Sequence, residues 1–284
     1  MLEQLYPLNV LEKNPWLGFL IGFSYGIIGI GISILLFPED PALVAVALIA
    51  LITYPTISRL MKQEEAIESQ KEEFSIFIFF KDHRHVFVLY LLFFIGVLLS
   101  FSLFSLFMPS LATNHIFENQ INVLYGASSG KATFSVGLFM DLLRNNFVVL
   151  TVIFITAFVL GDGGLFLVIW NASVWGTIFG NLAKHAALNI NMSPVLTFLL
   201  ILVIVTPHMM LEAFAYIASA TTGGVISKAV VYEKLFSKRF NFIVVNTIIS
   251  LIFALLVMIL AVGVETYVLN NVETYQRIIK ASFL

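Results

Sequence analysis

Long uninterrupted runs of apolar residues constrain the fold of this chain more than any other feature. A helix of about 20 apolar residues matches a hydrocarbon core about 30 Å thick. The chain has 284 residues, of which 60% are hydrophobic and 11% charged, with a mean hydropathy of +0.98. Soluble domains are about 45–50% apolar and about 25% charged. The sequence therefore predicts an all-α, polytopic transmembrane helix bundle, with spans near residues 16–37, 42–58, 86–108, 194–222 and 242–268.

Two further apolar runs, at residues 147–160 and 165–182, leave two interpretations open. The first of them is short for a transmembrane span. The pair is either a thin transmembrane hairpin or a re-entrant hairpin. Both options return the chain to the side that it left, so the bundle has about seven spans, or five plus a re-entrant pair.

Polar segments between the runs suggest a domain organisation. Residues 1–60 form an N-terminal transmembrane hairpin, 61–85 a cytoplasmic charged linker, 86–268 the transmembrane core and 269–284 a C-terminal tail. Within the core, segment 110–145 has apolar residues near helical spacing on both sides of a flexible stretch at 126–130. This pattern predicts two short amphipathic helices that lie at the outer membrane surface or over the bundle.

The distribution of basic residues indicates an orientation, because cytoplasmic loops are enriched in Lys and Arg. With the N-terminus inside, the cytoplasmic side carries Lys13, Arg59, Lys62, Lys71, Lys81, Arg84, Lys228, Lys234, Lys238 and Arg239. The outer side then carries Lys131, Arg144, Lys184, Arg277 and Lys280. We expect a multi-pass protein of the plasma membrane with a cytoplasmic N-terminus and an external C-terminus. The net charge of −2 gives no indication of nucleic-acid binding.

The span at 194–222 contains the most unusual polar residues of the chain. His208 and Glu212 are four residues apart, so they share one face of the helix, well inside the bilayer. Pro207 frees a backbone carbonyl and bends the helix, which opens a polar notch beside the histidine. Asn146 and Asn171, on neighbouring spans, are the expected polar partners. No other span is expected to add a second deeply buried His, Asp or Glu.

Polar groups inside a membrane must be satisfied without water, so this set has a functional and a structural interpretation. The functional one is a proton relay, a metal site or a coordination point for a transported group. The structural one is a neutral or mutually paired His208 and Glu212 that locks the helix against its neighbours. Two ligands are fewer than the three that a catalytic zinc needs, and the chain has no cysteine. We expect no catalytic residue, no metal and no cofactor.

Glycines recur in two spans at a spacing that favours close approach between membrane helices. We interpret them as packing positions: Gly22, Gly26, Gly29 and Gly31 in the first span, and Gly176 and Gly180 in the run at 165–182.

The string Thr206-Pro207-His208, with Glu212 four residues on, precedes an alanine-rich stretch and then Gly223-Gly224, which is expected to end or hinge the helix. This pattern resembles the signature of the stage II sporulation protein M family. The resemblance covers about residues 74–268 and leaves the first hairpin outside it.

The resemblance implies that His208, Glu212, Asn146 and Asn171 occupy signature positions. The family usually has a glycine after the histidine, where this chain has Met209. It also has Asn-Gly where Asn171 is followed here by an alanine.

In spore formers, members of this family resemble membrane anchors that gather cell-wall hydrolases at the engulfing septum. The resemblance therefore implies a non-catalytic integral membrane scaffold that assembles partner proteins. Its expected partners are the lipid bilayer and other membrane or envelope proteins, and a homo-oligomer is a further option. The alternative is a transporter or permease component that uses the intramembrane His208–Glu212 site. An intramembrane hydrolase is a third class.

Overall fold

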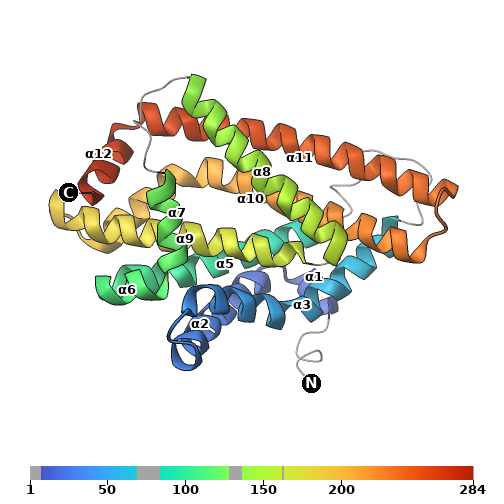
Figure 1. The fold of residues 1–284 in the computed structure, drawn as a ribbon, viewed down its shortest axis with the longest axis horizontal. Helices are drawn as coiled ribbons and strands as arrows, with labels where there is room; N and C mark the ends of the chain where they lie inside the picture. The colour runs from blue at the N-terminus through green and yellow to red at the C-terminus, as the bar shows by residue number, and fades with distance from the viewer. Residues whose placement is uncertain (1–7, 69–83, 128–135, 162, 284) are drawn as a thin grey trace.

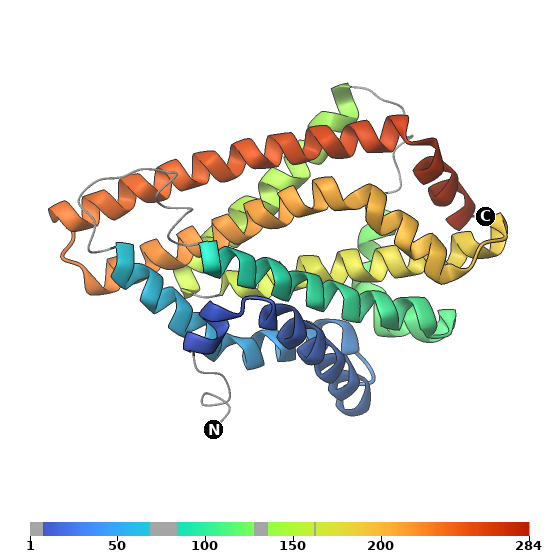
Figure 2. The same ribbon diagram turned by 180° about the vertical axis from the view of Figure 1, so that it is seen from behind.

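The computed structural model describes residues 8–68, 84–127, 136–161 and 163–283. Within these ranges every regular element is a helix (Figure 1). Most of the long helices run along the longest dimension of the molecule, and the short helix α12 lies across one end (Figures 1 and 2). The predicted all-α bundle is confirmed.

Seven of the described helices are long and apolar enough to cross a membrane. They are α2 (Leu17–Leu36), α3 (Pro41–Glu68), α5 (Arg84–Phe107), α8 (Val136–Leu160), α9 (Gly164–Ile190), α10 (Pro194–Tyr232) and α11 (Lys238–Asn271). Large apolar side chains such as Leu51, Val203 and Leu260 point outward from them and are exposed. An apolar outer surface suits hydrocarbon, so the chain is a multi-pass membrane protein.

The hairpin of α8 and α9 corrects the sequence prediction of a short span at 147–160. Helix α8 begins eleven residues earlier, at Val136, and its 25 residues include Asp141, Arg144 and Asn146. Both helices are long enough to cross the membrane, as Gly137–Leu160 and Gly164–Ile190. The polar residues concealed the first part of the helix because they interrupt the apolar run without interrupting the helix.

Four short helices complete the described part of the chain: α1 (Leu8–Lys13), α6 (Ser110–Ile116), α7 (Glu118–Ala127) and α12 (Glu273–Ser282). The segment at 110–145 thus begins with two short helices, but its last ten residues belong to α8. Helix α7 packs against α9 and α3, and α12 packs against α9. The predicted flexible link lies mostly in 128–135, outside the described residues. So does most of the predicted charged linker, of which α3 covers the part up to Glu68.

Glycines set the closest helix contacts, as the sequence predicts. In α2, Gly18 and Gly22 lie against the backbone carbonyls of Leu89 and Phe93 in α5. Gly176 and Gly180 bring α9 equally close to α5. Gly31 differs, because nothing lies within 4 Å of the position that its Cβ would take. The N-terminal hairpin is therefore packed tightly onto the core of the bundle.

Helix α10 occupies the centre of the bundle and packs against α8, α9 and α11. It begins at a serine cap, because the Oγ of Ser193 accepts a hydrogen bond from the backbone N–H of Leu196 at 3.2 Å. It bends along its length (Figure 2), and Pro207 lies inside it. Contrary to prediction, Gly223 does not end the helix: it lies against the carbonyl of Phe154 in α8, and the helix continues to Tyr232.

Candidate functional site

Glu212 lies near the middle of α10, about 27 Å along the helix from Pro194 at about 1.5 Å per residue. Its side chain is only 4% exposed. The Nδ2 of Asn146, in α8, donates a hydrogen bond to Glu212 Oε1 at 3.2 Å. The hydroxyl of Tyr216, one turn further along α10, donates to Asn146 Oδ1 at 3.0 Å. Asn146 is thus held between two side chains of α10.

A second glutamate belongs to this site. The carboxyl group of Glu265, in α11, is within hydrogen-bonding reach of the carboxyl group of Glu212. Glu265 Oε2 is buried and accepts no hydrogen bond from a donor among the described residues. The expectation that no other span supplies a buried acidic residue is therefore wrong. We call Glu212 and Glu265 the carboxyl pair.

The chemistry of two adjacent carboxyl groups favours a shared proton. An ionised carboxylate only accepts hydrogen bonds, so one of two carboxyl groups that bond to each other must be protonated. Two negative charges within hydrogen-bonding reach of each other would also repel strongly in surroundings from which water is excluded. The position of Glu212 and Glu265 between α10 and α11 therefore suits a shared proton.

The sequence does contain a signal for Glu265. Between Arg239 and Glu273 it is the sole Asp, Glu, Lys, Arg or His. It lies near the C-terminal end of α11, where an acidic residue ordinarily reaches the membrane surface. Helix α12 folds back at that end, and this covering of Glu265 is a tertiary feature that hydropathy does not predict.

His208 lies one turn before Glu212 in α10 and is 8% exposed. Its Nδ1 is buried and has no hydrogen-bond partner among the described residues. The structure brings Glu212 together with Asn146 and Glu265, and it records no hydrogen bond between His208 and Glu212 in the described part of the chain. Pro207, beside His208, is exposed at the bend of α10.

Asn171 lies on a groove between α8 and α9 that also reaches Asn146 and Tyr216. The groove has a volume of about 340 Å³, and its lining includes Trp170, Trp175 and several valines. Asn171 Nδ2 donates to the backbone carbonyl of Leu167 at 2.8 Å, so Asn171 does not join the carboxyl pair. Asn146 is the residue shared by the groove and the carboxyl pair.

Aromatic rings fix the position of Tyr216 at the base of the groove. The Trp175 ring lies 6.4 Å from the Tyr216 ring and makes an edge contact with Phe94 in α5, with centroids 5.4 Å apart. Tyr216 itself is fully buried. The hydroxyl that holds Asn146 is therefore carried by a ring with little freedom to move.

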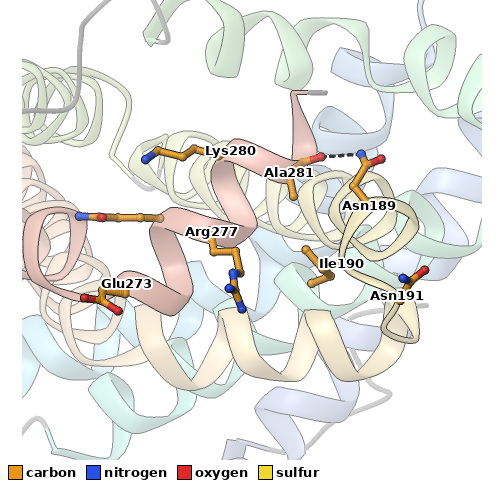
Figure 3. Close-up of a pocket in the computed structure, with 8 residues that line it drawn as sticks. Asn189, Ile190, Asn191, Glu273, Arg277, Lys280 and Ala281 are labelled. Atoms are coloured by element: carbon orange, nitrogen blue, oxygen red, sulfur yellow. Dashed lines mark hydrogen bonds between the residues drawn. The ribbon is translucent and has the colours of Figure 1, made fainter.

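The α12 end of the bundle covers Glu265. Tyr275 of α12 is buried, and burial together with the nearby Glu265 raises the pKa of its phenol well above the ordinary value. Asn189 Nδ2, at the end of α9, donates to the carbonyl of Ala281 at 2.8 Å and fixes α12 in place (Figure 3). A polar cavity of about 760 Å³ lies between α12 and the α9–α10 turn, with Arg277 and Lys280 among its lining (Figure 3).

The described residues contain no group of three or more His, Asp or Glu side chains that is placed to hold a metal ion. The carboxyl pair offers acidic oxygens from two residues, and its hydrogen bonds suit a proton better than a cation. Comparison of this chain with family models, with curated proteins and with solved structures gives no match in any of the three.

Proposed function

We propose that the protein is a component of a proton-coupled membrane transporter, with Glu212 and Glu265 as its proton-binding site. The observation that carries this proposal is the proximity of two carboxyl groups, those of Glu212 and Glu265, on adjacent membrane helices. Buried ionic groups seldom stabilise a fold better than apolar residues of the same volume. Ionisable residues inside a membrane commonly mark ion or substrate pathways.

The carboxyl pair offers a direct way to couple protons to helix movement. While it holds one proton, a hydrogen bond joins α10 to α11. Loss of that proton leaves two negative charges facing each other, and their repulsion favours separation of the helices. Asn146 transmits the change to α8, because it is bonded to both Glu212 and Tyr216. His208, one turn away on α10 with an unbonded ring nitrogen, is a candidate group to exchange the proton.

Proton movement through proteoliposomes tests this function. A pH-sensitive dye trapped inside vesicles of native membrane lipid reports the decay of an imposed pH gradient. Wild-type protein is expected to speed the decay, and Glu212→Gln and Glu265→Gln are expected to return it to the rate of empty vesicles. Glu273→Gln, at an exposed position of α12, serves as the matched control and should behave as wild type. Equal rates for wild type and both variants contradict the proposal.

The orientation proposed for the chain puts the α12 end outside the plasma membrane and the α10–α11 turn in the cytoplasm, as the distribution of basic residues favours. A reporter fused after Lys238 should then be cytoplasmic, and one placed at Leu284 should be external. A cytoplasmic reporter at Leu284 would contradict this orientation.

A membrane scaffold is the second candidate function. The resemblance to the stage II sporulation protein M family supports it, and so does the exposed charged face of α12, which includes Glu273, Arg277 and Lys280. Partners of a scaffold are other membrane or envelope proteins, or further copies of the chain. A scaffold keeps its function when Glu212 is replaced by Gln, whereas a proton-coupled transporter loses it.

A further inference from the structure

The groove between α8 and α9 combines a mostly apolar wall with a few polar groups, and this combination indicates a class of ligand. We infer that it binds an uncharged amphipath, with a hydroxyl group on an apolar chain, that reaches it from the bilayer. This inference rests on the proposed function, because it assigns the substrate class of the same transporter.

The position of the groove gives access from lipid. Its wall on α8 includes Val148 and Val152, which are 51% and 44% exposed on the outer surface of a membrane span. A volume of about 340 Å³ is at the lower end of the range for small-molecule pockets, about 300–1,000 Å³. A molecule dissolved in the bilayer therefore enters sideways, without crossing water.

The chemistry of the lining selects an uncharged polar group. None of the described residues that line the groove is Asp, Glu, Lys or Arg, so nothing there pairs with an ionic headgroup. Most of the wall is apolar and suits a hydrocarbon chain. The polar part consists of the amides of Asn145, Asn146 and Asn171 and the hydroxyl of Tyr216.

Two of these amides retain hydrogen-bonding capacity. Asn171 donates to Leu167, but its Oδ1 receives no hydrogen bond from the described residues. Asn145 is exposed and has no recorded hydrogen bond within the described part of the chain. Amide groups at membrane depth are costly to leave unsatisfied. A ligand hydroxyl that donates to Asn171 Oδ1 and accepts from Asn145 satisfies both residues.

Asn146 connects this site to the proton site. Its side chain lines the groove and is bonded to Glu212 at the same time. A change in the protonation of the carboxyl pair therefore alters the polar base of the groove, while the apolar wall stays as it is. This arrangement lets proton exchange change the affinity for the polar end of the ligand.

Tryptophan fluorescence provides the test, because two of the three tryptophans of the chain, Trp170 and Trp175, line the groove. The experiment uses Trp16→Phe protein in nanodiscs and measures quenching by dibromostearyl alcohol. A brominated phosphatidylcholine is the comparison probe. Quenching of the tryptophan fluorescence should reach saturation at a low mole fraction of the alcohol in the bilayer. In Asn171→Leu, the mole fraction of alcohol that gives half-maximal quenching should rise roughly tenfold, because one buried hydrogen bond to the ligand is lost.

Quenching that rises in proportion to the alcohol, and that matches the brominated phosphatidylcholine, would show ordinary lipid contact and overturn the inference. The comparison of the two quenchers tests the inference without the Asn171 substitution, so it remains valid even where Asn171→Leu fails to fold. Glu265→Gln separates the two proposals, because it should abolish proton flux and retain saturable quenching. Saturable quenching with no proton flux in the wild type would support the site and contradict the transporter.

Discussion

Replacing Glu212 with leucine is expected to destabilise the bundle by about 1–3 kcal/mol, because it leaves Glu265 and Asn146 without their buried partner. Glu265→Leu should have a similar cost for the same reason. The double variant should cost less than the sum of the two by about 0.5–3 kcal/mol, because no carboxyl group then remains unpaired. Unfolding in detergent, followed by circular dichroism, measures all three values.

Glu212→Gln is the matched control for this cycle. It keeps the shape of the side chain and an acceptor for Asn146, and its amide donates to Glu265. We therefore expect it to retain the fold and close to wild-type stability. Strict additivity of the two leucine substitutions would mean that the carboxyl groups of Glu212 and Glu265 do not interact, which would contradict the carboxyl pair.

Gly22→Ala is expected to destabilise the protein by about 1–3 kcal/mol, the usual cost of overpacking. The added Cβ would clash with the backbone carbonyl of Phe93 in α5, which has no rotamer with which to move away. Separating α2 from α5 would be needed to relieve the contact. The midpoint of thermal unfolding in detergent measures the effect.

Gly31→Ala is the control in the same helix. Nothing lies within 4 Å of its added methyl group, and alanine favours a helix more than glycine does. Its stability should equal or slightly exceed that of the wild type. Similar losses from both substitutions would mean that helix propensity, and not the contact with α5, determines the effect.

Much of the fold was predictable from hydropathy, because a long apolar run can satisfy its backbone in a membrane only as a helix. The predicted spans therefore match α2, α5 and α10 closely at their N-terminal ends. The errors arose where polar residues lie inside helices. Asp141 and Arg144 concealed the first part of α8, and two adjacent glycines suggested a break at Gly223 where α10 instead approaches α8.

The candidate site was only partly predictable. Spacing along one helix identified Glu212 and placed His208 beside it, and the buried position of both was correctly expected. Spacing does not show which face of α11 meets α10, so the contact between Glu265 and Glu212 needed the tertiary structure. The same limit applies to the two asparagines: Asn146 bonds to Glu212 and also lines the groove, whereas Asn171 lines only the groove.

Infrared difference spectroscopy tests most directly whether Glu212 and Glu265 share a proton. Acid and alkaline samples of the wild type, Glu212→Gln, Glu265→Gln and the exposed control Glu273→Gln are compared in the carbonyl region of protonated carboxyl groups. The proposal predicts one band for the shared proton in the wild type and in Glu273→Gln. Each of the other two variants should lose it. Two independent bands, each removed by a different variant, or an unchanged spectrum in both variants would contradict the shared proton.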